Sequence, residues 1–207
     1  MILKIACALG LLMATSLPHA GSATGATIFA DDFSSPASGW EVSGDANYKD
    51  GAYDILASDP SVLIWAVARR PAVSDVHIEV TARNVRGVAD ASFGIICNYR
   101  DENNFTLLGA GSDGHYAIIK FEDNRPVYLT SQKAEWPLSE RIKLNADHYR
   151  LGADCGSDAL TLYVDGVSVA TVKGASAGAG DVGLFAMANV NPQAEAKFDD
   201  FAESKLK

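Results

Sequence analysis

The stretch 149–172, YRLGADCGSDALTLYVDGVSVATV, decides the fold class, because its pattern predicts three short strands joined by two tight turns. In the first segment apolar side chains alternate with polar or small ones, which is typical of a strand buried on one face. The apolar set is Tyr149, Leu151, Ala153 and Cys155. Further on, Asp165 and Gly166 supply the positive φ angles that a two-residue hairpin turn requires. The stretch therefore predicts a half-buried antiparallel meander.

Similar segments recur about every ten residues, with turn residues between them. The clearest alternation is in 76–83, where aliphatic side chains face inward and His77, Glu79, Thr81 and Arg83 face outward. The other predicted strands are 27–33, 46–56 with a turn at Asp50-Gly51, 62–68, 92–99, 104–110, 115–121, 124–129, 182–189 and 194–203. Segment 134–144 contains Pro137 and has no helical stripe, so we expect a loop. About twelve or thirteen short strands without a helix predict an all-β, two-sheet antiparallel jelly-roll sandwich.

The chain begins with the three-part layout of a secretory signal. Lys4 precedes an apolar core from Ile5 to Leu17, and small residues suited to cleavage follow it. The core is much shorter than the roughly 20 residues that span a bilayer. We therefore predict a signal peptide over 1–23, with cleavage after Ala26 as the alternative, and a secreted or periplasmic protein whose single sandwich domain covers 27–204.

The composition limits the partners. The formal net charge is −9, and removal of Lys4 with the signal peptide makes the chain one charge more negative. Nucleic acid and anionic membrane surfaces are poor partners for such a protein. No later stretch is long and apolar enough to be a transmembrane segment. The oligomeric state is left open by the sequence.

Two cysteines remain after the signal peptide, and each lies on the apolar face of its predicted strand. Cys97 is in phase with Phe93 and Ile95, and Cys155 is in phase with Leu151. An exported protein reaches an oxidising compartment, where core-facing cysteines form disulfides. We expect a Cys97–Cys155 disulfide, and the alternative is two buried free thiols.

Four segments together resemble bacterial exported domains of the concanavalin A-like lectin/glucanase superfamily. They are ADDFSSPASGW, FGIICNYRDENNFTLLGAGSDGHY, LGADCGSDALTLYVDG, and the closing DVGLFAMA with KFDDF. The resemblance covers roughly residues 27–203 and extends to laminin-G-like modules and family 16 glycoside hydrolases. It implies two curved antiparallel sheets, with any ligand on the concave face or its rim loops. Sugar binders, glycosidases and adhesion modules all occur in this superfamily.

An enzyme of this superfamily needs paired carboxylates. Retaining glycosidases use two, about 5 Å apart, and family 16 enzymes carry them in a Glu-x-Asp-x-x-Glu run. This chain has no such run: Glu79 stands alone, and the closing acidic residues have the wrong spacing. No catalytic residue is therefore assigned. A glycoside hydrolase of the glucanase or 3-keto-disaccharide hydrolase type, with carboxylates from separate strands, remains an alternative.

Aromatic side chains indicate sugar binding, because sugar rings stack on aromatic faces while polar rims bind the hydroxyls. Five aromatic residues are out of phase with the core or on predicted loops: Trp65, Tyr116, Tyr128, Trp136 and Tyr163. Four polar residues share the non-core phase of strands that we expect to be neighbours: Asn98, Arg100, Arg150 and Asp154. We expect ligand binding in a shallow polar groove that involves Trp65, Asn98, Arg100, Tyr116, Arg150, Asp154 and Tyr163.

A structural calcium ion is the one cofactor that the sequence suggests. Asp31 and Asp32 near the first strand and Asp199 and Asp200 near the last would converge if the two ends of the domain meet. Carboxylate oxygens suit calcium, although turn-capping aspartates give the same pattern. His77, His115 and His148 have no paired spacing that would indicate zinc.

The sequence therefore predicts an exported, disulfide-bonded, concanavalin A-like sandwich that binds carbohydrate without catalysis. The second hypothesis is the glycoside hydrolase described above. The third is an adhesion or envelope-interaction protein without a sugar site, which an apolar surface patch in place of a polar groove would favour.

Overall fold

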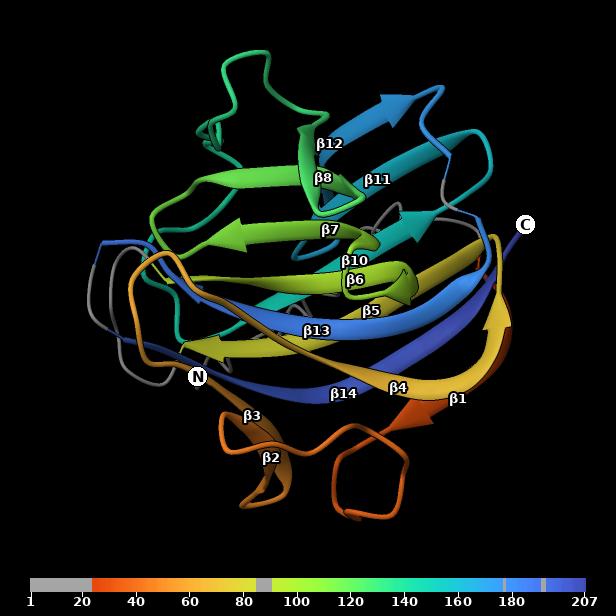
Figure 1. Cartoon of the computed structure of the whole chain (residues 1–207), viewed down its shortest axis with the longest axis vertical. Helices are drawn as coiled ribbons and strands as arrows, with labels where there is room; N and C mark the ends of the chain where they lie inside the picture. Colours follow the sequence, from red (N-terminus) through yellow and green to blue (C-terminus); the bar gives the residue numbers. More distant parts are fainter. Residues whose placement is uncertain (1–23, 85–90, 177, 191–192) are drawn as a thin grey trace, which may run out of the picture.

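The structure is a computed structural model that describes residues 24–84, 91–176, 178–190 and 193–207. The predicted signal peptide lies outside the described residues. Within them the chain forms fourteen β-strands and no α-helix, arranged as two antiparallel sheets packed face to face (Figure 1). None of these residues belongs to a helix of the length and apolarity needed to cross a membrane. The expected two-sheet sandwich is therefore confirmed.

The larger sheet has eight strands and contains the meander of the opening stretch. Its order is β12 (Val167–Lys173), β11 (Ala159–Val164), β10 (Tyr149–Cys155), β5 (Val76–Asn84), β14 (Ala194–Leu206), β3 (Ala52–Ala57) and β2 (Ala46–Lys49). The first strand, β1 (Thr24–Asp31), also pairs with β14. Asp165 and Gly166 adopt φ angles of 50° and 76° between β11 and β12, as the hairpin prediction requires.

The smaller sheet has six strands. Its order is β4 (Leu63–Val73), β13 (Gly180–Ala188), β6 (Ala91–Asp101), β7 (Asn104–Gly111), β8 (Tyr116–Glu122) and β9 (Arg125–Tyr128). Segment 134–144 follows this sheet as a loop, as the proline predicted. Cleavage after Ala26 would remove the first residues of β1, whereas cleavage after Ala23 leaves this strand whole.

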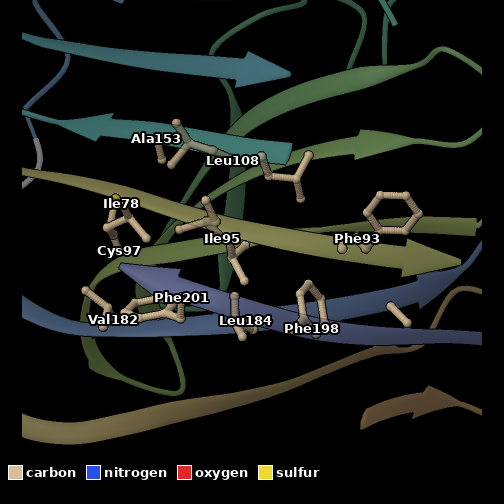
Figure 2. Close-up of a cluster of buried hydrophobic side chains, with 14 of the residues drawn as sticks. Ile78, Phe93, Ile95, Cys97, Leu108, Ala153, Val182, Leu184, Phe198 and Phe201 are labelled. Carbon is tan, nitrogen blue, oxygen red and sulfur yellow. The ribbon is translucent and has the colours of Figure 1, made fainter. Parts of the chain in front are cut away.

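The main hydrophobic core lies between the two sheets. Ile78 of the larger sheet and Ile95 and Leu184 of the smaller sheet are fully buried in it (Figure 2). The predicted disulfide is present here: Cys97 on β6 and Cys155 on β10 are bonded, with their Cα atoms 6.5 Å apart. Because β6 and β10 belong to different sheets, the bond joins the two layers covalently.

A buried ion pair provides a second tie between the layers. Arg70 on β4 of the smaller sheet bonds the carboxylate of Glu203 on β14 of the larger sheet. The Glu203 side chain is 2% exposed and the Arg70 side chain is 20% exposed. The Arg70 guanidinium also lies 3.9 Å from the ring centroid of Phe29, a cation–π contact.

Candidate functional site

The outer face of the six-stranded sheet is apolar, which is unusual for the solvent side of a sandwich. Side chains of β6, β7 and β8 alternate between the core and this outer face, and most of both sets are apolar. On the outer face Phe105, Leu107, Ile119 and Phe185 are each at most 4% exposed and form a second hydrophobic cluster. Large apolar side chains therefore pack against one another on this face and shield it from solvent.

Two glycines allow the large side chains to lie flat on the sheet. The ring of Phe185 covers Gly94 and Gly109, and a Cβ atom added at either position would come within 2.5 Å of that ring. The indole of Trp136 also reaches Gly109, at 3.1 Å from such a Cβ. Glycine at these positions thus fixes Phe185 and brings the loop residue Trp136 onto the sheet.

A pocket of about 280 Å³ opens on this face. Its floor consists of the buried side chains of Phe105, Leu107 and Ile119. Its walls are formed by half-buried side chains: Leu63, Trp65, Phe121, Tyr128, Trp136 and Met187. The polar residues that line it are Ser61, Glu102 and Asn124, all exposed at the rim. We call this feature the aromatic pocket.

The rings of the aromatic pocket support one another. The ring centroids of Trp65 and Phe105 are 5.8 Å apart, and those of Phe105 and Phe121 are 4.4 Å apart in a stacked arrangement with an interplanar angle of 17°. Offset or tilted packing at these separations is favourable for aromatic pairs. The pocket is therefore held in shape before any ligand arrives.

Two tight turns hold the polar rim. In the β6–β7 turn, the Asp101 carboxylate accepts hydrogen bonds from the backbone N–H of Asn103 and from Asn104 Nδ2, both at 2.9 Å. The bond from Asn104, followed by that from Asn103, lowers the pKa of Asp101. In the β8–β9 turn, Asn124 adopts a φ of 61° and its N–H donates to the carbonyl of Asn103 at 2.9 Å. The two turns that present Glu102 and Asn124 are thus bonded to each other.

The structure brings together only some of the aromatic residues singled out in the sequence. Trp65, Tyr128 and Trp136 line the aromatic pocket. Tyr116 instead packs against the main core between the sheets. Tyr163 lies on the larger sheet, where its hydroxyl donates to Asp154 at 2.7 Å. The members that meet therefore come from β4, β9 and the loop after β9.

The expected polar groove is not present, because β6 and β10 are not neighbours. β6 pairs with β7 and β13, whereas β10 pairs with β5 and β11 in the other sheet. Outward side chains of the two sheets point in opposite directions, so Asn98 and Arg100 do not share a surface with Arg150 and Asp154. The alternation indicated which face of a strand is buried but not which strands are adjacent.

Asn98 and Arg100 lie where β6 departs from regular pairing. Asn98 has a φ of 55° at a bulge and is 8% exposed. With its amide oriented so that the nitrogen donates, this nitrogen is 3.1 Å from the carbonyl oxygens of both Gly178 and Ala179, and Asn98 then supports the segment that leads into β13. Arg100 is exposed and reaches Asn104 Oδ1 at 3.4 Å. Neither residue lines the aromatic pocket.

Arg150 and Asp154 belong to an ionic network on the outer face of the larger sheet. His77 Nδ1 is 2.6 Å from Asp154 Oδ1, and His77 Nε2 is 3.4 Å from Glu79 Oε1. Arg150 Nη2 is 2.9 Å from Glu79 Oε2. With Tyr163 bonded to Asp154, these five side chains form a continuous chain of contacts that we call the His77 network.

The His77 network shifts the pKa values of His77 and Glu79. Burial lowers the pKa of His77, but the hydrogen bonds to Asp154 and Glu79, together with the charges of these carboxylates, outweigh burial and raise it to about 9. The hydrogen bond from His77 outweighs burial and, with that from Arg150, lowers the pKa of Glu79 to about 2. At neutral pH His77 and Glu79 therefore carry opposite charges in contact with each other.

The four aspartates proposed for calcium converge only partly. Asp31 pairs with Phe201 across β1 and β14, and Asp31, Asp32 and Asp200 line one shallow depression. The Asp31 carboxylate, however, accepts hydrogen bonds from Phe33 N at 2.8 Å and Trp40 Nε1 at 3.0 Å. Asp199 accepts a bond from the backbone N–H of Asp200. Within the described residues no three histidine, cysteine or acidic side chains are grouped to hold a metal ion.

The sequence pattern missed the floor of the aromatic pocket. Phe105, Leu107 and Ile119 were assigned to predicted strands without a functional role. The available signal was the continuous apolar character of IIC, FTLLGA and YAIIKF in place of strict alternation. Such runs indicate strands that are buried on both faces.

The fold resembles that of solved carbohydrate-active proteins. The carbohydrate-binding module CBM66 from Bacillus subtilis matches with a TM-score of 0.64 and 18% identity, over 81% of this chain and 96% of that chain. A β-glucanase from Bacillus licheniformis matches with a TM-score of 0.59 and 11% identity, over 88% and 99%. A protein of unknown function with a galectin-like fold from Bacillus subtilis matches with a TM-score of 0.65 and 10% identity, over 89% and 98%.

These likenesses show that the chain has the concanavalin A-like jelly-roll fold, which a carbohydrate-binding module and a glycoside hydrolase share. At these identities they show the fold alone. Neither the protein-family models nor the curated proteins include a match to this sequence.

Proposed function

We propose that this protein is an exported, non-catalytic carbohydrate-binding module whose sugar site is the aromatic pocket. The observation that carries the proposal is the convergence of Trp65, Tyr128 and Trp136 over an apolar floor, with Ser61, Glu102 and Asn124 at the rim. A sugar ring has apolar C–H faces and a polar edge, so it matches aromatic walls and a polar rim.

The walls and rim of the aromatic pocket are held in place without a ligand, which favours binding. The ring contacts of Phe105 with Trp65 and with Phe121 hold the walls in place, and the bonded turns hold the rim. Groups that are already ordered lose little conformational entropy when a ligand binds. The carbohydrate-related neighbours of the fold are in line with this use of the site.

Export is supported by two independent features. The predicted signal peptide directs secretion, and the Cys97–Cys155 disulfide suits an oxidising compartment such as the periplasm or the cell exterior. Polysaccharides of the cell surface and the surroundings are accessible there.

The positions of the carboxylates favour sugar binding over hydrolysis of a glycosidic bond. A glycosidase needs two carboxyl groups about 5 to 9.5 Å apart across the scissile bond. Of the residues that line the aromatic pocket, only Glu102 carries a carboxylate. Glu79 and Asp154 lie on the other sheet within the His77 network, and the low pKa of Glu79 keeps it from donating a proton at neutral pH.

One observation favours a second candidate function, docking of an apolar segment of an envelope protein. The lining is mostly apolar, and the loop that carries Trp136 also exposes Leu138 and Leu144, which are 67% and 66% exposed. Exposed apolar side chains beside an apolar hollow are typical of interaction sites. We rank this function second because the hollow is a small pocket lined by rings.

Affinity electrophoresis of the mature chain in gels that contain soluble polysaccharides tests the proposal. We expect at least one polysaccharide to retard the protein, Trp65→Ala to abolish the retardation, and Tyr163→Ala, which removes a half-buried aromatic ring from the other sheet, to retain it. Lack of retardation by a broad panel, or equal retardation of wild type and Trp65→Ala, would overturn the proposal. Binding of an apolar peptide without any glycan binding would support the second candidate instead.

A further inference from the structure

The aromatic pocket carries polar side-chain groups at its rim and on its walls, where Trp65 and Trp136 have indole N–H groups and Tyr128 has a hydroxyl, but none on its floor. Ser61, Glu102 and Asn124 are at the rim, whereas the floor of Phe105, Leu107 and Ile119 offers no side-chain donor or acceptor. An unsubstituted hexose carries hydroxyl groups around its whole ring. A hydroxyl directed at this floor would lose its bonds to water and gain no partner, which is unfavourable. The pocket therefore favours a sugar with an apolar group on one edge.

The size of the pocket limits that group. At about 280 Å³, it is slightly below the roughly 300 to 1,000 Å³ of pockets that enclose drug-sized ligands. It suits one sugar ring with a small substituent and is too small for a long acyl chain. A methyl-bearing substituent would fill the space above Leu107 and Ile119.

The rim narrows the choice to an acetamido group. Among the described residues Glu102 is the only charged one in the lining, and its carboxylate can accept a hydrogen bond. Asn124, held on its bonded turn, can both donate and accept. An acetamido group offers one N–H donor, one carbonyl acceptor and one methyl group. The N–H thus matches Glu102, the carbonyl matches Asn124, and the methyl group matches the apolar floor. The carboxylate of Glu102 also disfavours anionic sugars.

We infer that the aromatic pocket selects neutral 2-acetamido sugars over the corresponding hexoses. The inference rests on the proposed function and goes further by naming the class of sugar. The ring stacks on the aromatic walls, the acetamido N–H donates to Glu102, and the methyl group lies on the apolar floor.

Calorimetric titration with two trisaccharides tests the inference. Chitotriose and cellotriose share their linkage and differ at C2, where an acetamido group replaces a hydroxyl. We expect chitotriose to bind at least about tenfold tighter, from burial of one methyl group and added hydrogen bonds. The deacetylated trisaccharide, which keeps the nitrogen as an amine and loses the acetyl carbonyl and methyl group, should lose this advantage at a pH at which its amines are neutral.

A pair of variants tests the role of the rim. Glu102→Ala should reduce the preference for chitotriose several-fold and leave cellotriose affinity nearly unchanged. Glu122→Ala is the matched control, because this exposed glutamate on the neighbouring β8 pairs with Lys120 and does not line the pocket. It should leave both affinities unchanged.

The possible outcomes separate the acetamido preference from sugar binding itself. Equal affinity for the two trisaccharides, or binding of the deacetylated form as tight as that of chitotriose, overturns the acetamido preference and leaves sugar binding standing. The same holds if neither trisaccharide binds while another polysaccharide does. If no glycan binds, the proposed function fails and the inference fails with it.

Discussion

The indole of Trp65 and the ring of Phe105 lie with their centroids 5.8 Å apart on the outer face of the six-stranded sheet. Trp65 comes from β4 at one edge of that sheet and Phe105 from β7, with β13 and β6 between them. The contact therefore spans the face and joins the wall of the aromatic pocket to its floor. A ring in this position is both ordered and partly exposed, as a sugar-stacking residue must be.

Trp65→Ala should weaken glycan binding by about 2 kcal/mol or more, because stacking rings at the centre of a binding site carry a large share of its energy. The variant should remain folded, since Trp65 is only half-buried and lies outside the main core. Calorimetry with the best polysaccharide from the gel panel gives the change in affinity, and circular dichroism checks the fold. An unchanged affinity would show that Trp65 does not contribute to glycan binding.

Replacing both cysteines, Cys97→Ala with Cys155→Ala, should destabilise the protein. The bond closes a loop with a sequence separation of 58 residues, for which the chain-entropy model gives about 4 kcal/mol. Urea unfolding of the variant and of the oxidised wild type measures the difference. A thiol titration of the denatured wild type should find no free thiol, and two reactive thiols would contradict the prediction.

The His77 network should make stability depend on pH at both ends of the range. The pKa of His77 is raised from 6.5 to about 9, so its contribution is complete below pH 6.5 and is lost as pH rises through 9. The pKa of Glu79 is lowered from 4.5 to about 2, so its contribution is complete above pH 4.5 and is lost as pH falls through 2. The network therefore stabilises fully between about pH 4.5 and 6.5.

Urea unfolding midpoints at pH 5.5, 7.5 and 9.5 measure the alkaline side of this dependence. The wild type should lose stability from pH 5.5 to 9.5, and His77→Asn should lose less over the same interval. Parallel curves for the two proteins would show that His77 does not carry the effect.

Removing one partner of the Arg70–Glu203 pair should lower the free energy of unfolding much more than replacing both partners with apolar residues. Glu203→Gln leaves the Arg70 charge buried without its partner and should cost about 3 to 5 kcal/mol. The double variant Arg70→Met with Glu203→Leu removes both charges and should be much closer to wild type. Urea unfolding of the two variants makes the comparison; if the double variant is the less stable one, the pair contributes more than charge matching.

Much of the fold followed from alternation and turn residues. The phase of Cys97 and Cys155 was enough to predict their disulfide, since both face the same core, and Asp165-Gly166 predicted its hairpin. Alternation could not assign strands to sheets, because β6 and β10 have equivalent patterns and meet only across the core. For that reason the expected polar groove combined residues from opposite faces, such as Asn98 and Arg150.

The sequence indicated some residues of the aromatic pocket but not that they meet. Trp65, Tyr128 and Trp136 stood out as aromatic residues away from the predicted core, but their convergence depends on the sheet order and on the loop that brings Trp136 to Gly109. A loop position of this kind is set by tertiary packing, on which local pattern carries no information.

The indole N–H signals of the three tryptophans show whether a glycan binds in the aromatic pocket. Trp65 and Trp136 line the aromatic pocket, whereas Trp40 is 4% exposed and donates from Nε1 to Asp31 in the core. In ¹H–¹⁵N NMR spectra, assigned with single Trp→Phe variants, glycan titration should shift the signals of Trp65 and Trp136 and leave that of Trp40 in place. A glycan that binds without moving either pocket signal would contradict the assignment of the site.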